Sequence, residues 1–155
     1  MIQRIQSLYL LLTTMLSVLF LNVPFLTFFK ESGSYIQITL RGFLSQVQGK
    51  NEEVILGSLP IYLLIIMIIL ISAITILSFR NRKIQLLLSK LLILLISILI
   101  IVAVIYSLFI VKKYNATIIP GIKMAIPVLL LILSILAYRG IKKDNDLIKS
   151  YDRLR

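Results

Sequence analysis

The stretch LPIYLLIIMIILISAITILSF, residues 59–79, decides the fold class of this chain of 155 residues. It contains no charged side chain, and its length matches the roughly 20 residues that a helix needs to cross the hydrocarbon core of a bilayer. Three further stretches of similar length have no charged residue at their centres: residues 5–29, 84–111 and 117–138. The sequence therefore predicts four transmembrane helices.

The composition favours a membrane protein over a soluble domain. Hydrophobic residues make up 59% of the chain and the mean hydropathy is +1.03, more than one soluble core of this size holds. Backbone groups in hydrocarbon must be hydrogen-bonded within a helix or a closed barrel, and these continuous runs lack the alternation of barrel strands. We therefore expect an all-α membrane protein, a four-transmembrane-helix bundle that forms a single integral membrane domain over residues 1–155.

Basic residues outnumber acidic ones by 17 to 6, and their distribution predicts the orientation. In membrane proteins, lysine and arginine concentrate in short cytoplasmic segments. If both termini are cytoplasmic, the basic residues on that side are Arg4, Arg80, Arg82, Lys83, Lys90, Arg139, Lys142, Lys143, Lys149, Arg153 and Arg155. Those on the other side are fewer: Lys30, Arg41, Lys50, Lys112, Lys113 and Lys123. This asymmetry predicts cytoplasmic termini, and it explains the net charge of +11 by topology and anionic lipid, without nucleic acid.

The segment between the first two spans, residues 30–58, predicts a small extracytoplasmic β segment. Residues 35–41 alternate strictly, with Ile36, Ile38 and Leu40 on one face and polar or aromatic residues on the other. Residues 53–56 can return as a partner strand after the turn signal of residues 49–51. Two interpretations remain open: a sheet that caps the bundle, or an edge strand that Ile36, Ile38 and Leu40 offer to another protein.

The cytoplasmic tail, residues 139–155, predicts a short amphipathic helix. At 100° per residue, its apolar residues fall within an arc of roughly 140°: Ile141, Leu147, Ile148, Tyr151 and Leu154. Such a helix can lie on the inner leaflet or pack its apolar stripe on a cytoplasmic partner. Leu147, Tyr151 and Leu154 are therefore candidate partner contacts, although Asp144 interrupts the arc.

Side chains that carry chemistry are scarce. The chain has no cysteine and no histidine, which excludes disulfides, thiolate catalysis and imidazole ligation. All six acidic residues lie outside the predicted spans, whereas proton and ion pathways need ionisable groups inside the membrane. Serines near the centres of the spans have no histidine, lysine or paired aspartate beside them to activate them. We therefore expect no enzyme activity, no catalytic residue, no cofactor and no metal site.

Three stretches resemble a known family. They are the opening MIQRIQSLYLL (residues 1–11), the basic turn NRKIQ (residues 81–85) and the terminal DRLR (residues 152–155). Together with the order of the spans, they resemble an uncharacterised membrane family of Bacteroidota, domain of unknown function 4293. The resemblance implies a bacterial inner membrane and four helices. It carries no catalytic motif and implies no mechanism.

The expected function follows largely by exclusion. An apolar bundle with a cap and a basic tail can support partners through packing alone, so we expect a non-catalytic accessory or scaffolding subunit of a larger inner-membrane complex, with export or motility machinery as possible hosts. Its partners would be membrane lipids and other membrane-protein subunits. The alternative is a small transporter, channel or lipid-handling protein, in which hydroxyls and exposed carbonyls near Pro120 and Pro127 line a route.

Overall fold

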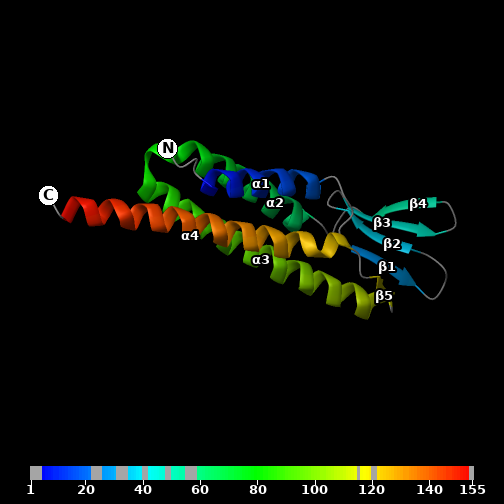
Figure 1. The fold of residues 1–155 in the computed structure, drawn as a ribbon. Helices are drawn as coiled ribbons and strands as arrows, with labels where there is room; N and C mark the ends of the chain where they lie inside the picture. Colours follow the sequence, from blue (N-terminus) through cyan, green and yellow to red (C-terminus); the bar gives the residue numbers. More distant parts are fainter. Residues whose placement is uncertain are drawn as a thin grey trace.

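Four α-helices lie side by side with a β-sheet at one end (Figure 1). The computed structural model describes residues 5–21, 26–30, 35–39, 42–47, 50–54, 59–114, 116–119 and 122–153. The helices are α1 Ile5–Leu21, α2 Leu59–Leu77, α3 Arg82–Tyr114 and α4 Ile126–Arg153. Two short 3-10 segments, η1 Ser78–Arg80 and η2 Ile122–Ala125, follow α2 and precede α4.

The helices form a closed ring. Helix α1 packs on α2, α2 on α3, α3 on α4, and α4 returns to α1. Because the chain direction alternates, the N-terminus, the turn between α2 and α3 and the C-terminal part of α4 share one end of the molecule, opposite the sheet (Figure 1). We call it the basic end, since it carries Arg82, Lys83, Arg139, Lys142 and Lys143.

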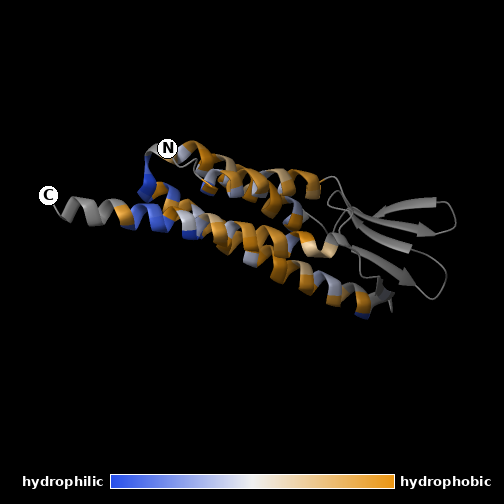
Figure 2. Cartoon of the chain, in the orientation of Figure 1, coloured by the Kyte–Doolittle hydropathy of each residue, from blue (hydrophilic) through white to orange (hydrophobic). Residues whose placement is uncertain are grey.

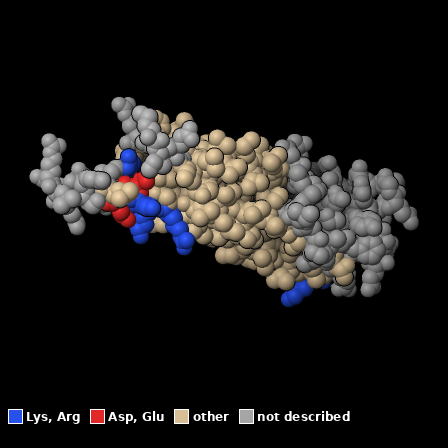
Figure 3. Space-filling model, in the orientation of Figure 1, with Lys and Arg blue, Asp and Glu red and all other residues tan. Residues whose placement is uncertain are grey.

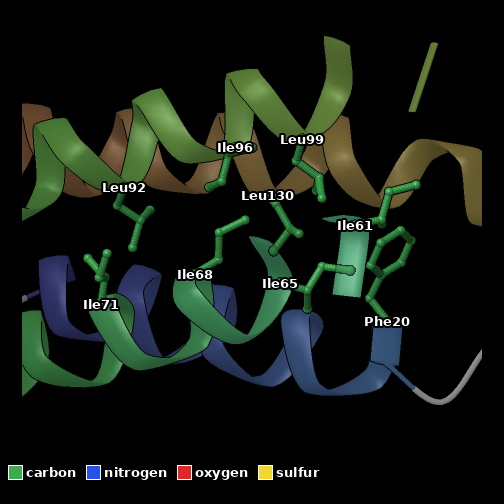
Figure 4. Packing of buried hydrophobic residues seen from close by; sticks show 9 residues of the cluster. All are labelled: Phe20, Ile61, Ile65, Ile68, Ile71, Leu92, Ile96, Leu99 and Leu130. Atoms are coloured by element: carbon green, nitrogen blue, oxygen red, sulfur yellow. The ribbon is translucent and has the colours of Figure 1, made fainter. Parts of the chain in front are cut away.

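The core lies along the axis of the bundle. Helical spacing places Ile61, Ile65 and Ile68 on one face of α2, where all three are buried. They meet a matching set from the other three helices (Figure 4): Phe20, Leu92, Ile96, Leu99 and Leu130. This packing determines how the helices are arranged around the axis.

The outer faces of α2 and α3 are as apolar as the inner ones (Figure 2). Both helices are long and apolar enough to cross a membrane, over Pro60–Leu77 and Arg82–Phe109. Only 28% and 22% of these windows are buried, whereas the core helix of a soluble protein would be mostly buried. Their exposed apolar surface therefore matches lipid better than water. Helix α1 is apolar but shorter, at 17 residues.

The turn between α2 and α3 is tight. Asn81 donates its amide to the carbonyl of Ser78 at 3.1 Å, and its own carbonyl accepts from the amide of Gln85 at 3.0 Å. These two bonds close η1 and start α3. So short a connection requires α2 and α3 to be antiparallel neighbours, as predicted for the spans at 59–79 and 84–111.

The sheet has five antiparallel strands in the order β4-β3-β2-β1-β5. Their bounds are β1 Leu26–Lys30, β2 Tyr35–Thr39, β3 Gly42–Val47, β4 Lys50–Val54 and β5 Ala116–Ile119. Strands β1 to β4 form a meander between α1 and α2, whereas β5 arrives from the far end of α3 and pairs with β1. The sheet thus joins two segments far apart in the sequence.

The register places six apolar positions together on one face of the sheet, which also includes Ser45, opposed to Ile36, and Lys30 of β1. Directly opposed residues share a face, and Ile38 is opposed by Leu26 on one side and by Phe43 on the other. Ile36 is likewise opposed by Phe28, which in turn faces Ile118. We call these six positions, Leu26, Phe28, Ile36, Ile38, Phe43 and Ile118, the apolar sheet face.

Two predicted spans are wrong at their outer ends. Residues 5–29 do not form one helix, because α1 ends at Leu21 and Leu26–Lys30 is strand β1. Pro24 lies between them in the sequence, where it lacks the amide that a continuing helix needs. Residues 117–138 do not form one helix either, because the first residues of that range belong to strand β5, Ala116–Ile119. Residues 26–30 pair with β2 and β5, and residues 116–119 pair with β1, so sheet pairing determines both outcomes.

Three other predicted boundaries also differ from the structure. The β segment is not confined to residues 30–58, since β1 precedes that range in part and β5 lies beyond α3. Helix α3 is longer than residues 84–111 at both ends. The predicted tail helix of residues 139–155 is not separate, because α4 runs unbroken from Ile126 to Arg153.

Candidate functional site

The interior of the bundle contains several polar side chains. Those that are buried among the described residues are Gln6, Thr13, Ser17, Ser72, Thr75, Gln85, Ser89 and Ser134. The hydroxyls mostly bond to carbonyls of their own helix, as Ser17 does to Thr13 and Thr75 to Ile71, at 2.8 and 2.6 Å. Within the described part of the chain, no buried side-chain nitrogen or oxygen lacks a partner. The hydroxyls therefore satisfy themselves locally and need no bound ion.

One hydroxyl pair connects two helices. The Oγ1 atom of Thr14 in α1 lies 3.0 Å from the Oγ atom of Ser72 in α2. Thr14 also lies 2.8 Å from the carbonyl of Leu10, and Ser72 lies 2.9 Å from that of Ile69. This is a packing contact with a polar component, of the kind that transmembrane helices commonly use.

The most polar arrangement lies at the basic end. Gln6 in α1 donates its side-chain amide to the carboxylate of Asp144 in α4. Arg82, at the start of α3, donates to the backbone carbonyl of Asp144 at 3.3 Å. Gln85 in α3 lies beside them and donates to the carbonyl of Thr75 in α2 at 3.4 Å. We call Gln6, Arg82, Gln85 and Asp144 the terminal polar cluster; it joins all four helices.

A glycine permits this contact. A Cβ atom at Gly140 would lie 2.6 Å from the Cγ atom of Gln6, far inside van der Waals contact. Gly140 is one turn before Asp144 on α4, so the absence of a side chain lets Gln6 cross the helix surface and reach the carboxylate. The space enclosed by the terminal polar cluster and Ile141 has no volume for a water molecule. The cluster is therefore a direct helix-to-helix contact rather than a pocket.

The predicted partner contacts lie at opposite ends of the molecule. Leu147 is 50% exposed on the C-terminal part of α4, which also contains Tyr151. Ile36 and Ile38 lie in β2, on the apolar sheet face. Leu40 and Leu154 lie outside the described residues. The structure therefore separates these residues into two surfaces and does not gather them into one site.

Sequence reasoning missed the terminal polar cluster. Its signals were present: Gln6 opens an otherwise apolar run, and Asp144 interrupts the apolar arc of the tail. A polar side chain at each of these positions needs a hydrogen-bond partner where the helices pack. The sequence does not reveal that Gln6 and Asp144 bond to one another. Two of the stretches that carry the family resemblance, residues 1–11 and 81–85, contribute Gln6, Arg82 and Gln85 to it.

Among the described residues, no group of three or more histidine, cysteine, aspartate or glutamate side chains is placed so that it could hold a metal ion. The features that do stand out are a helical bundle with two helices long and apolar enough to cross a membrane, an antiparallel sheet at one end and a charged opposite end. Figure 3 shows an uncharged surface along most of the bundle, with lysine, arginine and aspartate side chains gathered at the basic end and further basic side chains at the opposite end.

These features define a class: a four-helix bundle in which two helices are long and apolar enough to span a membrane. The family model described as a domain of unknown function (DUF4293) matches residues 2–154, so the chain belongs to this family, as its opening and its basic turn predict. No curated protein and no solved structure gives a significant match.

Proposed function

We propose that the protein is a four-pass protein of the bacterial inner membrane, with both termini cytoplasmic and the sheet on the opposite side. Helices α2 and α3 have the length and apolarity of membrane spans, and α1 and α4 run beside them in the same bundle. The basic end carries the short turn at Arg82 and Lys83, as the positive-inside rule requires of a cytoplasmic end.

We further propose that it acts without catalysis, as an accessory or scaffolding subunit of a larger membrane complex, for which export or motility machinery are possible hosts. The observation that carries this proposal is the character of the interior. The axis is filled by isoleucine and leucine, and the buried hydroxyls bond to their own helices. A filled interior leaves the outer surfaces as the places where the protein acts.

Two surfaces suit a protein partner. The apolar sheet face presents a row of aliphatic and aromatic positions, and the main contact between the sheet and the helices is that of β5 with α3. The second surface is the extension of α4 beyond the terminal polar cluster, with Leu147 exposed. A subunit with contacts at both ends can connect partners on the two sides of a membrane.

The experiment is purification of the intact protein from native membranes, with quantitative mass spectrometry of what remains bound. We expect a stoichiometric partner that is lost from Ile38→Asp and retained by Gln37→Asp, because these neighbours lie on opposite faces of β2. The double variant Leu147→Asp, Tyr151→Asp tests the other surface. A solitary particle would contradict the subunit proposal, and a partner retained equally by all variants would contradict these two surfaces as its contacts.

The lipid-handling alternative has one observation in its favour. A groove of about 190 Å³ lies between α3 and α4 near the sheet, and its lining is almost wholly apolar: Ile100, Ala103, Val104, Ser107, Met124, Pro127 and Val128. Pro127 was already part of the predicted route. In the same purification, a solitary particle that carries lipid or solute in stoichiometric amount would favour this alternative.

A further inference from the structure

One face of α4 changes from apolar to basic along its length. Leu129, Ile132 and Leu136 are exposed apolar residues, and Arg139 and Lys143 follow them as exposed cations. At 100° per residue, these five positions fall within an arc of roughly 80°, so they form one continuous stripe. Figure 2 shows the same change along α4, from hydrophobic to hydrophilic toward the C-terminus.

The basic part of this stripe is hollowed. Arg139, Lys142, Lys143, Asp146 and Leu147 line an open depression of about 450 Å³. Three cations and one carboxylate give the depression a formal charge of +2, by subtraction of one from three. It therefore attracts an anion. The exposed apolar residues Leu129, Ile132 and Leu136, which we call the apolar track, continue from it along α4, and a simple anion would not contact them.

We propose that this stripe binds a phospholipid with an anionic, hydroxylated headgroup, of the phosphatidylglycerol type. The phosphodiester lies against Arg139, Lys142 and Lys143, and one acyl chain follows Leu136, Ile132 and Leu129 toward the sheet. The proposal rests on the membrane insertion proposed above, since lipid acyl chains reach Leu129, Ile132 and Leu136 only in a protein that is inserted in a membrane or extracted from one with its bound lipid.

Each part of the ligand matches a part of the surface. The planar guanidinium of Arg139 can hold two phosphate oxygens, and lysines add charge to the same group. The trimethylammonium of phosphatidylcholine would meet three cations and is disfavoured. Asp146 would repel a bare phosphate, but its carboxylate accepts hydrogen bonds, which the glycerol hydroxyls of the headgroup supply. The single acidic residue in the depression therefore favours a polyol headgroup over phosphatidic acid.

The test is native mass spectrometry of the full chain in a non-ionic detergent, with phosphatidylglycerol and phosphatidylcholine added in equal amounts. The binding variant is Arg139→Gln, Lys142→Gln, Lys143→Gln. The matched control removes the same charge from exposed positions outside the depression: Lys83→Gln, Lys90→Gln, Lys112→Gln. We expect the wild type and the control to retain phosphatidylglycerol preferentially, and the binding variant to lose about tenfold or more in retention.

Three outcomes would overturn the proposal. The first is no preference of the wild type for phosphatidylglycerol, and the second is an equal loss in both triple variants, which would indicate general charge attraction. The third is displacement of the lipid by millimolar inorganic phosphate, which would indicate a site for the free anion. Asp146→Asn gives an independent arm, in which phosphatidylglycerol and phosphatidic acid are added in equal amounts. The preference of the wild type for phosphatidylglycerol should fall in this variant, and an unchanged ratio of the two lipids would contradict the role of the carboxylate.

Failure of the membrane proposal is separable from failure of this one. Fractionation of cells that express the wild type reports membrane insertion directly. A wild type that sits in the membrane fraction but shows no lipid preference contradicts only the lipid site. A wild type outside the membrane fraction contradicts the membrane proposal and the lipid site with it.

Discussion

Gln6 and Asp144 are 138 positions apart in the sequence, yet the side-chain amide of one donates a hydrogen bond to the carboxylate of the other. The bond joins the first helix of the bundle to the last and closes the ring at the basic end. Arg82 adds a bond from α3 to the carbonyl of the same aspartate. Asp144 is therefore the residue through which three helices meet, and it provides the first prediction.

Asp144→Ala should destabilise the bundle. The substitution removes the acceptor of a charge-assisted hydrogen bond and leaves the amide of the buried Gln6 without that partner, at a cost of about 1–3 kcal/mol in the free energy of unfolding. Asp146→Ala, two residues on and exposed, should change it by less than about 0.5 kcal/mol. Unfolding of both variants in the same detergent checks this, and equal midpoints for the two would count against the contact.

Gly140→Ala should be destabilising only while Gln6 is present. The added Cβ would come within 2.6 Å of the Cγ atom of Gln6, so that side chain must move away from Asp144. In a Gln6→Ala background the clash is gone, and the alanine should be neutral or stabilising by up to about 1 kcal/mol, as expected for glycine to alanine in a helix. A double-mutant cycle measures the difference. Additive effects of the two substitutions would show that the close approach is not as described.

Ser72→Ala should cost more than Ser97→Ala. Ser72 is buried and lies 3.0 Å from Thr14 across the interface of α1 with α2, whereas Ser97 bonds only to the carbonyl of Ile93 in its own helix. Hydrogen bonds between transmembrane helices contribute about 0.6 kcal/mol on average, so we expect a difference of that size. Thermal unfolding of the two variants side by side is the measurement. A larger loss from Ser97→Ala would reverse the assignment.

Ile68→Ala should be among the most damaging single substitutions in α2. Ile68 is fully buried in the core, and truncation to alanine leaves a cavity that costs about 2–5 kcal/mol. Leu70, two positions on, is 51% exposed and serves as the matched control, since Leu70→Ala removes a side chain from the outer surface. The folded yield and the unfolding midpoint should be lower for Ile68→Ala than for Leu70→Ala. Comparable losses would mean that α2 does not face inward through Ile68.

The elements that the sequence predicts well are those with a local signal. Residues 59–79 form helix α2 at Leu59–Leu77 because the run is apolar throughout and Pro60 suits a first helical turn. The strand predicted at residues 35–41 corresponds to β2 at Tyr35–Thr39, because strict alternation fits only one pleated face. In both cases the residues of the segment itself determine the outcome.

The elements that it misses depend on partners far away. Strand β1 continues the apolar character of α1, so composition alone assigns it to the span; its register with β2 and β5 makes it a strand. Strand β5 begins beyond α3 and is apolar as well, so it was predicted as the start of the fourth span. The contact of Gln6 with Asp144 is likewise invisible, since neither residue indicates the other until α4 packs on α1.

The proposed orientation places the sheet and the C-terminal end of α4 on opposite sides of a membrane. The chain has no cysteine, so Ser45→Cys in β3 and Ser150→Cys in α4 each introduce a single reactive thiol. Treated with a membrane-impermeant thiol reagent in intact spheroplasts, Ser45→Cys should be labelled, and Ser150→Cys should react only after the membrane is lysed. Labelling of Ser150→Cys in intact spheroplasts, with Ser45→Cys protected until lysis, would contradict the orientation, and labelling of both before lysis would contradict a sheet and tail separated by the membrane.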